Sequence, residues 1–207
     1  MHRIEESLTV KCFLQKWRLI AKQVEQLPID VDWIVARRLG CSSLSDLYFK
    51  EEIFLDDRLI RDIELDMRKL MEGLPFEYVL GECFFDGEWI KVRSSTLIPR
   101  PETEELLRNI PWDLIPCNGR YLDLGCGSGC IALAMKKFRP NAIVCASDIC
   151  VLALDVARSN ANSLVRDILF REGNWFLPWK GELFDLVSKS SNEWLVGAHF
   201  FSSYSLA

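Results

Sequence analysis

The first third of the chain repeats apolar residues at spacings of three and four positions. This spacing places them on one face of a helix, as at Leu14, Trp17, Ile20 and Val24. It predicts helices near residues 6–26, 30–39 and 56–72. Gly40 and Gly73 suit the ends of the second and third, because glycine adopts the left-handed conformation that follows many helices. We interpret this part as a small helical domain that either only packs on its neighbour or docks a substrate.

Two short apolar segments then flank Asp86-Gly87, a pair that tight hairpin turns favour. The run from Cys83 to Val92 is therefore predicted to be a β-hairpin between two domains. Residues 96–101 read Thr-Leu-Ile-Pro-Arg-Pro and should be extended, because proline fixes its own φ and disfavours the helical region for the residue before it. A helix is expected over 102–108.

Beyond Pro116 the pattern changes to strands that alternate with helices. It predicts strands at 121–125, 142–148, 167–171 and 183–188, and helices at 129–139 and 149–162. This alternation is typical of a parallel, doubly wound sheet. The expected fold class is therefore α/β.

Composition and charge narrow the class of protein. A chain of 207 residues, 49% hydrophobic and 27% charged, is typical of a globular protein. No apolar run approaches the roughly 20 residues of a membrane span, and the first residues lack the apolar core of a signal peptide. The formal charge of −5 disfavours direct binding to nucleic acid. We expect a cytoplasmic monomer without membrane or nucleic-acid partners.

The eight cysteines show none of the paired spacings of a zinc site. Buried free thiols in a reducing compartment are the simplest interpretation. Cys126 and Cys130 flank glycines in a loop that needs small side chains. No metal is expected there.

The main candidate site is the segment Asp123-Leu124-Gly125-Cys126-Gly127-Ser128-Gly129, between a predicted strand and a predicted helix. Closely spaced glycines let a ligand approach the backbone at the helix N-terminus, at the carboxyl edge of the sheet. The spacing G-x-G-x-G differs from the dinucleotide fingerprint G-x-G-x-x-G. A plain structural turn is the alternative.

Asp148 ends the next predicted strand, about twenty residues beyond the loop. A carboxylate at this place can accept hydrogen bonds from both hydroxyls of a ribose. A helix N-cap is the alternative for a lone acid at a strand end. Together with the glycine loop, the position favours the ribose.

The loop resembles that of class I S-adenosylmethionine-dependent methyltransferases, and two further segments narrow the resemblance. Residues 75–82, Pro-Phe-Glu-Tyr-Val-Leu-Gly-Glu, and 96–104, Thr-Leu-Ile-Pro-Arg-Pro-Glu-Thr-Glu, closely resemble the HemK-type release factor glutamine methyltransferases. With the helical first domain and Asn174-Trp175-Phe176, the resemblance covers roughly residues 8–187. It implies a Rossmann-like methyltransferase domain with S-adenosylmethionine as its cofactor.

The resemblance also implies roles for particular residues. The loop residues cradle the methionine part of the cofactor: Gly125, Cys126, Gly127, Ser128 and Gly129. Asp123 helps to hold the ammonium group, and Asp148 binds the ribose. Asn174 stands where the family usually has an acid and still offers a carbonyl to the adenine amino group. Trp175 packs near the adenine or the substrate entry, with a core tryptophan as the alternative.

The implied reaction transfers the sulfonium methyl group to the amide nitrogen of a glutamine in the Gly-Gly-Gln loop of a peptide-chain release factor. An amide nitrogen is a poor nucleophile, because its lone pair is delocalised into the carbonyl. Catalysis would therefore rest on alignment and on hydrogen bonds to the amide. No strong general base is needed, since the proton can leave late.

The resemblance ends after Val187. The family continues with Asn-Pro-Pro-Tyr, whose asparagine side chain and proline carbonyl hold the substrate amide. This chain reads Ser188-Lys189-Ser190-Ser191-Asn192-Glu193 instead, so we assign no catalytic residue. We expect a C-terminally incomplete domain with four strands, in which 183–188 forms an open, uncovered edge. The tail would come from a shifted reading frame or an alternative exon.

These interpretations predict a helical substrate-docking domain at 1–75, a hairpin and linker at 76–101, a partial methyltransferase domain at 102–187 and an atypical tail at 188–207. The leading function is release factor glutamine methylation, impaired in this chain. A non-catalytic fragment that binds cofactor or protein is one alternative. Another amino-methyltransferase, such as one acting on DNA adenine, is a second, although the charge and residues 75–82 weigh against it.

Overall fold

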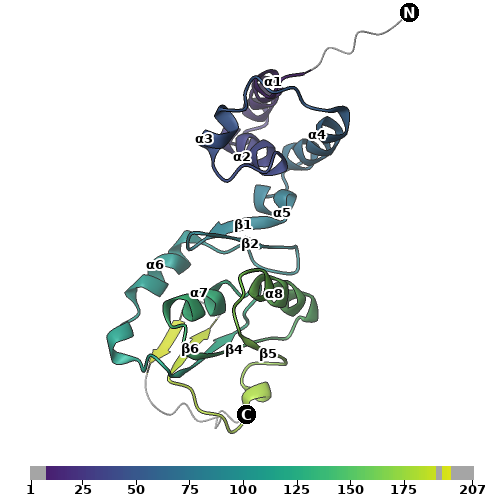
Figure 1. Ribbon diagram of the computed structural model, residues 1–207. Coiled ribbons are helices and arrows are strands. Elements are labelled where there is room, and N and C mark those ends of the chain that lie inside the picture. The colour runs from purple at the N-terminus through teal and green to yellow at the C-terminus, as the bar shows by residue number, and fades with distance from the viewer. Residues whose placement is uncertain (1–7, 190–192, 197–207) are drawn as a thin grey trace, which may run out of the picture. The chain divides into compact units, whose positions relative to one another are not determined.

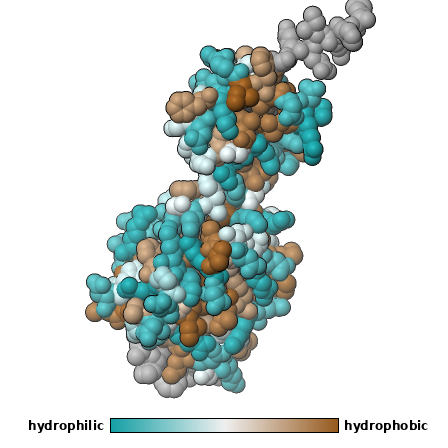
Figure 2. All heavy atoms as spheres, in the orientation of Figure 1, coloured by the Kyte–Doolittle hydropathy of each residue, from teal (hydrophilic) through white to brown (hydrophobic). Residues whose placement is uncertain are grey.

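The structure is a computed structural model that describes residues 8–189 and 193–196. The chain divides into two compact units, Met1–Leu80 and Gly81–Ala207 (Figure 1). In Figure 2 the visible face of each unit carries mostly hydrophilic residues, with hydrophobic ones scattered among them. Among the described residues, no helix combines the length and apolarity needed to cross a membrane.

The described part of the first unit is helical. Its elements are α1 (Val10–Gln23), α2 (Pro28–Arg38), α3 (Leu44–Tyr48), α4 (Asp57–Met71) and α5 (Phe76–Leu80). The three long helices confirm the predicted ones, and Gly40 and Gly73 follow α2 and α4 with φ of 68° and 90°. The short helices α3 and α5 were not predicted. A five-residue helix is too short to show the apolar period.

The first unit has an apolar core with buried carboxylates that are held in ion pairs, and Asp32 is one of them. Phe13, Leu14 and Met67 are fully buried. Asp32, 4% exposed, accepts hydrogen bonds from Arg18 at 2.7 Å (Nε) and 2.8 Å (Nη2). The hydroxyl of Tyr48 donates to the same carboxylate at 3.1 Å. A buried carboxylate is tolerated only with such partners.

The second unit begins with the predicted hairpin, formed by β1 (Glu82–Phe85) and β2 (Glu88–Lys91). Asp86 and Gly87 make its turn with φ of 48° and 82°. Two positive φ angles match the twist of antiparallel strands, which explains the Asp-Gly pair. The chain then passes to α6 (Pro101–Asn109), which begins at a proline with its missing N–H outside the helical ladder.

The main sheet has the strand order β5-β4-β3-β6-β7. The strands are β3 (Arg120–Leu124), β4 (Ile143–Asp148), β5 (Leu169–Glu172), β6 (Leu186–Lys189) and β7 (Glu193–Val196), and two longer helices connect them, α7 (Cys130–Phe138) and α8 (Val151–Ser163). Two short 3-10 turns, 112–114 and 177–179, lie in the connections. The first four strands are parallel, as predicted.

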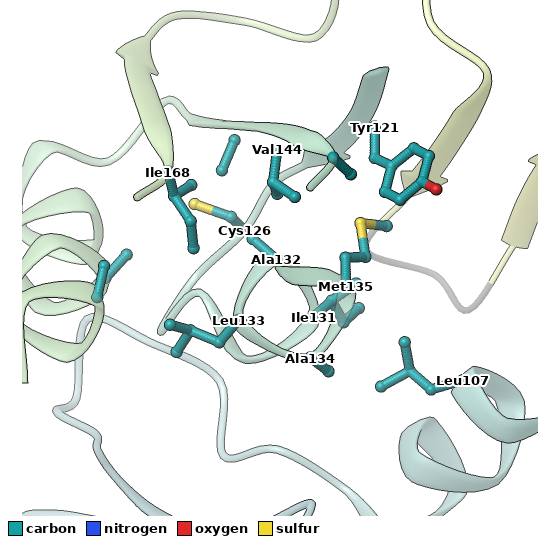
Figure 3. Packing of buried hydrophobic residues seen from close by; sticks show 14 of the residues in the cluster. Leu107, Tyr121, Cys126, Ile131, Ala132, Leu133, Ala134, Met135, Val144 and Ile168 are labelled. Carbon is teal, nitrogen blue, oxygen red and sulfur yellow. The ribbon is translucent and has the colours of Figure 1, made fainter. Parts of the chain in front are cut away.

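The core of this unit lies between the sheet and its helices. Figure 3 shows Tyr121 of β3 and Val144 of β4 facing Ala132 and Met135 of α7. All four are at most 1% exposed. Burial of a side chain of the size of methionine or valine contributes about 1.5–3 kcal/mol, so this layer fixes how α7 sits on the sheet.

The expected open edge at 183–188 is wrong. Within the described residues the sheet has five strands, and β6 lies between β3 and β7. β7 pairs with β6 in antiparallel orientation, from Leu186 opposite Val196 to Lys189 opposite Glu193. A short connection permits only this orientation, because a parallel neighbour needs a crossover of about a dozen residues or more. The predicted tail otherwise falls mainly on 190–192 and 197–207, outside the described residues.

Candidate cofactor site

The glycine loop leaves the carboxyl end of β3 and enters α7, as predicted. The backbone N–H groups of Gly125 and Cys126 both donate to the carbonyl of Ser147, at 2.8 and 3.0 Å. Gly125, Gly127 and Gly129 have φ of 68°, 54° and 80°, a region that glycine enters at little cost. The loop is thus a fixed turn held against the end of β4.

Gly129 also brings two helices together. It precedes α7 as the N-cap residue, and an added Cβ would lie 3.0 Å from the Cβ of Ala157 in α8. Real Cβ atoms rarely approach so closely. Both the left-handed backbone and the close approach therefore require glycine here.

Asp148 ties the end of β4 to the loop. Its Oδ2 accepts a hydrogen bond from the N–H of Gly127 at 2.9 Å, and its Oδ1 accepts one from the N–H of Cys150 at 2.9 Å. Cys150, and not Asp148, is the N-cap residue of α8. An ionised carboxylate has about four lone-pair positions, so Asp148 keeps capacity for further donors.

Asp123 is a buried acid with an unused acceptor. It is 1% exposed, and its Oδ2 accepts a hydrogen bond from the N–H of Ala132 at 3.1 Å. Within the part of the chain that the structure describes, its Oδ1 has no hydrogen-bond partner. Burial raises the pKa of this carboxyl to about 7, and the nearby charge of Asp148 adds to the rise, whereas the hydrogen bond from the N–H of Ala132 and the nearby side chain of Ser188 oppose it. A cationic donor at Oδ1 would satisfy the free oxygen and favour the ionised form.

A cavity of about 150 Å³ lies at the carboxyl ends of β3 and β4. Its lining residues are Leu124, Gly125, Asp148, Ile149, Gly173, Asn174 and Trp175. The structure therefore brings Gly125, Asp148, Asn174 and Trp175 together, although they come from three separate segments of the sequence. A concave site with a few convergent polar groups is the usual form of a small-molecule site.

Trp175 stands at this cavity in an unusual conformation. Its φ is 49°, and the residue is 47% exposed. The ammonium nitrogen of Lys189, at the end of β6, lies 5.0 Å from the centroid of the indole ring. The exposure excludes the alternative of a core tryptophan.

Two other predicted loop residues lie beneath the surface. Cys126 is 6% exposed and belongs to the hydrophobic core, and Ser128 is 2% exposed. Burial raises the pKa of the thiols of Cys126 and Cys130, so both remain neutral. Cys126 and Ser128 contribute to the loop through their small side chains and their backbone groups.

Sequence reasoning missed three residues of the site. Ile149 and Gly173 line the cavity beside predicted residues, and Asn160 of α8 bonds to the carbonyl of Ser128. The available signal for Asn160 was a polar residue on the apolar face of a helix, in step with Ala153 and Ala157. No group of three His, Cys, Asp or Glu side chains could hold a metal ion in the ranges that the structure describes.

The parallel sheet, the glycine loop and the acid at the end of the next strand define the second unit as a class I methyltransferase domain. Residues 101–189 match the family model of the methyltransferase small domain. The resemblance to HemK-type enzymes is confirmed as well, so the chain is a relative of the release factor glutamine methyltransferases.

Three of these relatives show the extent of the match. The release factor glutamine methyltransferase of Streptococcus pneumoniae is 38% identical over 157 residues, which cover 74% of this chain and 55% of that protein. The Xylella fastidiosa protein is 35% identical, covering 82% and 62%. The Neisseria gonorrhoeae protein is 44% identical, covering 53% and 40%. The chain thus spans about half the length of the curated relatives it matches.

Proposed function

We propose that this chain binds S-adenosylmethionine in the cavity at the ends of β3 and β4. The observation that carries the proposal is the convergence of Gly125, Asp148, Asn174 and Trp175 on that cavity. The unpartnered oxygen of the buried Asp123 fits the ammonium group that such a cofactor carries. When bound, this cofactor supplies an activated methyl group.

The chain's own residues then position the cofactor. The glycine loop receives the methionine part, because its backbone can be approached closely. Asp148 accepts hydrogen bonds from the ribose hydroxyls through the lone pairs that are not used by the N–H groups of Gly127 and Cys150. The carbonyl of the Asn174 side chain accepts a hydrogen bond from the adenine amino group. The exposed indole of Trp175 packs against the adenine ring.

We further propose that the reaction of this protein's family is methylation of the glutamine side-chain amide in the Gly-Gly-Gln loop of a peptide-chain release factor. The names of the relatives support this substrate. The chain would contribute alignment of the amide nitrogen with the methyl group, since an amide needs orientation more than a base. Such a protein would work as a monomer in the cytoplasm, where its cysteines stay reduced.

A specific observation favours a second function, cofactor binding without transfer. β6 ends at Lys189, after which the sequence continues Ser190-Ser191-Asn192 and contains no Asn-Pro-Pro-Tyr. No residue of the described chain is therefore assigned to hold the substrate amide.

Two measurements on the full chain separate these functions. Isothermal titration with S-adenosylhomocysteine tests the cofactor site, and no detectable heat at millimolar ligand would contradict it. Transfer of a radiolabelled methyl group to a release factor, with a variant whose Gly-Gly-Gln glutamine is alanine as control, tests the reaction. Binding with transfer supports methylation of the glutamine. Binding without transfer supports the second function.

A further inference from the structure

One side chain joins three separate parts of the second unit. Asn160 lies in α8 and is 2% exposed. Its Oδ1 accepts a hydrogen bond from the N–H of Lys91 at 2.7 Å. Its Nδ2 donates to the carbonyl of Lys91 at 2.9 Å and to the carbonyl of Ser128 at 2.9 Å. Both amide hydrogens and one lone pair are thus used on backbone groups of β2 and of the glycine loop.

The bond to Ser128 completes a two-sided hold on the loop. Asp148 holds the N–H of Gly127 from the β4 side, and Asn160 holds the carbonyl of the next residue from the α8 side. The peptide group before Gly127 and the peptide group after Ser128 are therefore both fixed in orientation. In the proposed function these two peptide groups belong to the cradle for the methionine part of the cofactor.

The bonds to Lys91 connect this hold to the hairpin and to the segment after it. The backbone nitrogen of Leu97 would lie 4.0 Å from a Cβ added to Gly127, so this segment passes directly over the loop. The hydroxyl of Thr96 accepts from the N–H of Arg93 at 3.1 Å and donates to its carbonyl at 3.0 Å, which fixes the turn between β2 and Leu97. By fixing the position of β2, Asn160 therefore also sets the spacing between Leu97 and the glycine loop.

We infer that Asn160 is a positioning residue of the cofactor site. It fixes the glycine loop directly through Ser128 and sets the position of the covering segment through Lys91. The inference rests on the proposed function for its effect on the cofactor, but its structural part concerns the loop alone. Loss of the amide should therefore loosen the loop and weaken cofactor binding by more than the lost stability explains.

A second contact between α8 and its following turn and the hairpin is an ion pair, and it provides a matched control. Arg166 Nη2 donates to Glu88 Oε1 at 2.7 Å, and the Arg166 side chain is only 12% exposed. This ion pair fastens β2 without touching the glycine loop. Arg166→Met should lower stability while leaving the bond between Asn160 and Ser128 intact.

Two substitutions of Asn160 separate its donors from its acceptor. Asn160→Leu has a similar size and removes all three bonds. Asn160→Asp keeps an acceptor for the N–H of Lys91 but turns an oxygen toward two carbonyls. If Asn160→Leu does not fold, Asn160→Asp remains decisive, because it keeps the bond from the N–H of Lys91.

The test measures the dissociation constant for S-adenosylhomocysteine and the melting temperature of each full-length variant. We expect both Asn160 variants to bind about tenfold more weakly or worse, as for a lost buried hydrogen bond. Arg166→Met should stay within about twofold at a similar loss of melting temperature. Affinities that simply follow melting temperature across all three variants would overturn the inference.

Hydrogen exchange gives a readout that needs no cofactor. The amides of Gly127 and Gly129 should exchange faster in the Asn160 variants and at the parent rate in Arg166→Met. Unchanged exchange at these amides contradicts the positioning role, whatever the affinities show. If the parent chain binds no cofactor, the proposed function fails, and hydrogen exchange alone decides the inference.

Discussion

The carboxylate of Asp148 and the backbone N–H of Gly127 lie 2.9 Å apart and form a hydrogen bond between the end of β4 and the glycine loop. The residue proposed to bind the ribose therefore also orients the cradle for the rest of the cofactor. Both tasks depend on one carboxylate, because Gly127 takes only part of its acceptor capacity.

Asp148→Ala should weaken binding of S-adenosylhomocysteine by about 1–3 kcal/mol, the scale of a lost buried hydrogen-bond partner. The substitution removes the ribose acceptor and frees the N–H of Gly127 at once. Isothermal titration measures the change. Asp155→Ala, which removes an exposed acid of α8, is the control and should leave affinity unchanged. Equal affinities in all three proteins would refute the role of Asp148.

Asp123 should make stability depend on pH. Its pKa is about 7 in the folded chain and 3.8 in the unfolded one, so the folded chain binds more protons between these values. The free energy of unfolding therefore falls as pH rises from about 4 to about 7 and stays lower above, by on the order of 2–4 kcal/mol. The contribution of Asp123 is measured by denaturant unfolding of the parent and of Asp123→Asn at each pH. If the difference between their free energies of unfolding does not change with pH, Asp123 makes no such contribution.

Gly129→Ala should destabilise the second unit through two separate effects. The positive φ costs an alanine about 1–2 kcal/mol, and its Cβ would press on Ala157. The double variant Gly129→Ala with Ala157→Gly removes the contact and keeps the backbone strain. Differential scanning calorimetry should therefore show partial recovery of the melting temperature, after correction for Ala157→Gly alone. No recovery would mean that the contact costs nothing.

Trp175→Ala should weaken binding of S-adenosylhomocysteine by on the order of 1–3 kcal/mol, the range for stacking of an aromatic side chain on a base. Trp175→Phe should keep most of the affinity. Phe49→Ala, at a 90% exposed position of the first unit, is the control and should bind as the parent does. Titration of the three variants checks the order. Phenylalanine and alanine variants of equal affinity would contradict stacking.

Arg18→Met should destabilise the first unit by about 2–4 kcal/mol, because it removes two charged hydrogen bonds to the buried Asp32 carboxylate and keeps the neutral donor Tyr48. Lys11→Met, which breaks the exposed pair with Glu52, should cost less than about 1 kcal/mol. Hydrogen exchange in α1 and α2 reports the stability of this unit. Similar losses in both variants would show that burial adds nothing to the Arg18 pair.

Elements with a strong local signal were predictable from the sequence. The long helices carry apolar faces, and Asp86-Gly87 marks the hairpin turn whose positive φ angles the structure shows. The glycine loop and Asp148 were predictable because backbone conformation and strand order place them at one edge of the sheet. The pairing of β6 with β7 was not, because the residues after Val187 were interpreted as an atypical tail, in which no strand was expected.

Tertiary contacts with no local pattern stayed hidden. Nothing around Asn160 in the sequence shows that its amide reaches Lys91, 69 residues earlier, and Ser128, 32 residues earlier. The unpartnered oxygen of Asp123 was equally hidden, since burial and partners depend on the whole packed unit. Such polar contacts between distant segments decide how the site is held.

The amide of Asn160 has one more consequence, for self-association. It occupies the N–H and the carbonyl of Lys91 together, as a neighbouring strand would, and so closes this part of the outer edge of β2. Unpaired strand edges are templates for pairing between chains, which leads to strand exchange and aggregation. A single side chain inside a helix thus protects a two-stranded ribbon from recruiting a foreign strand at that position.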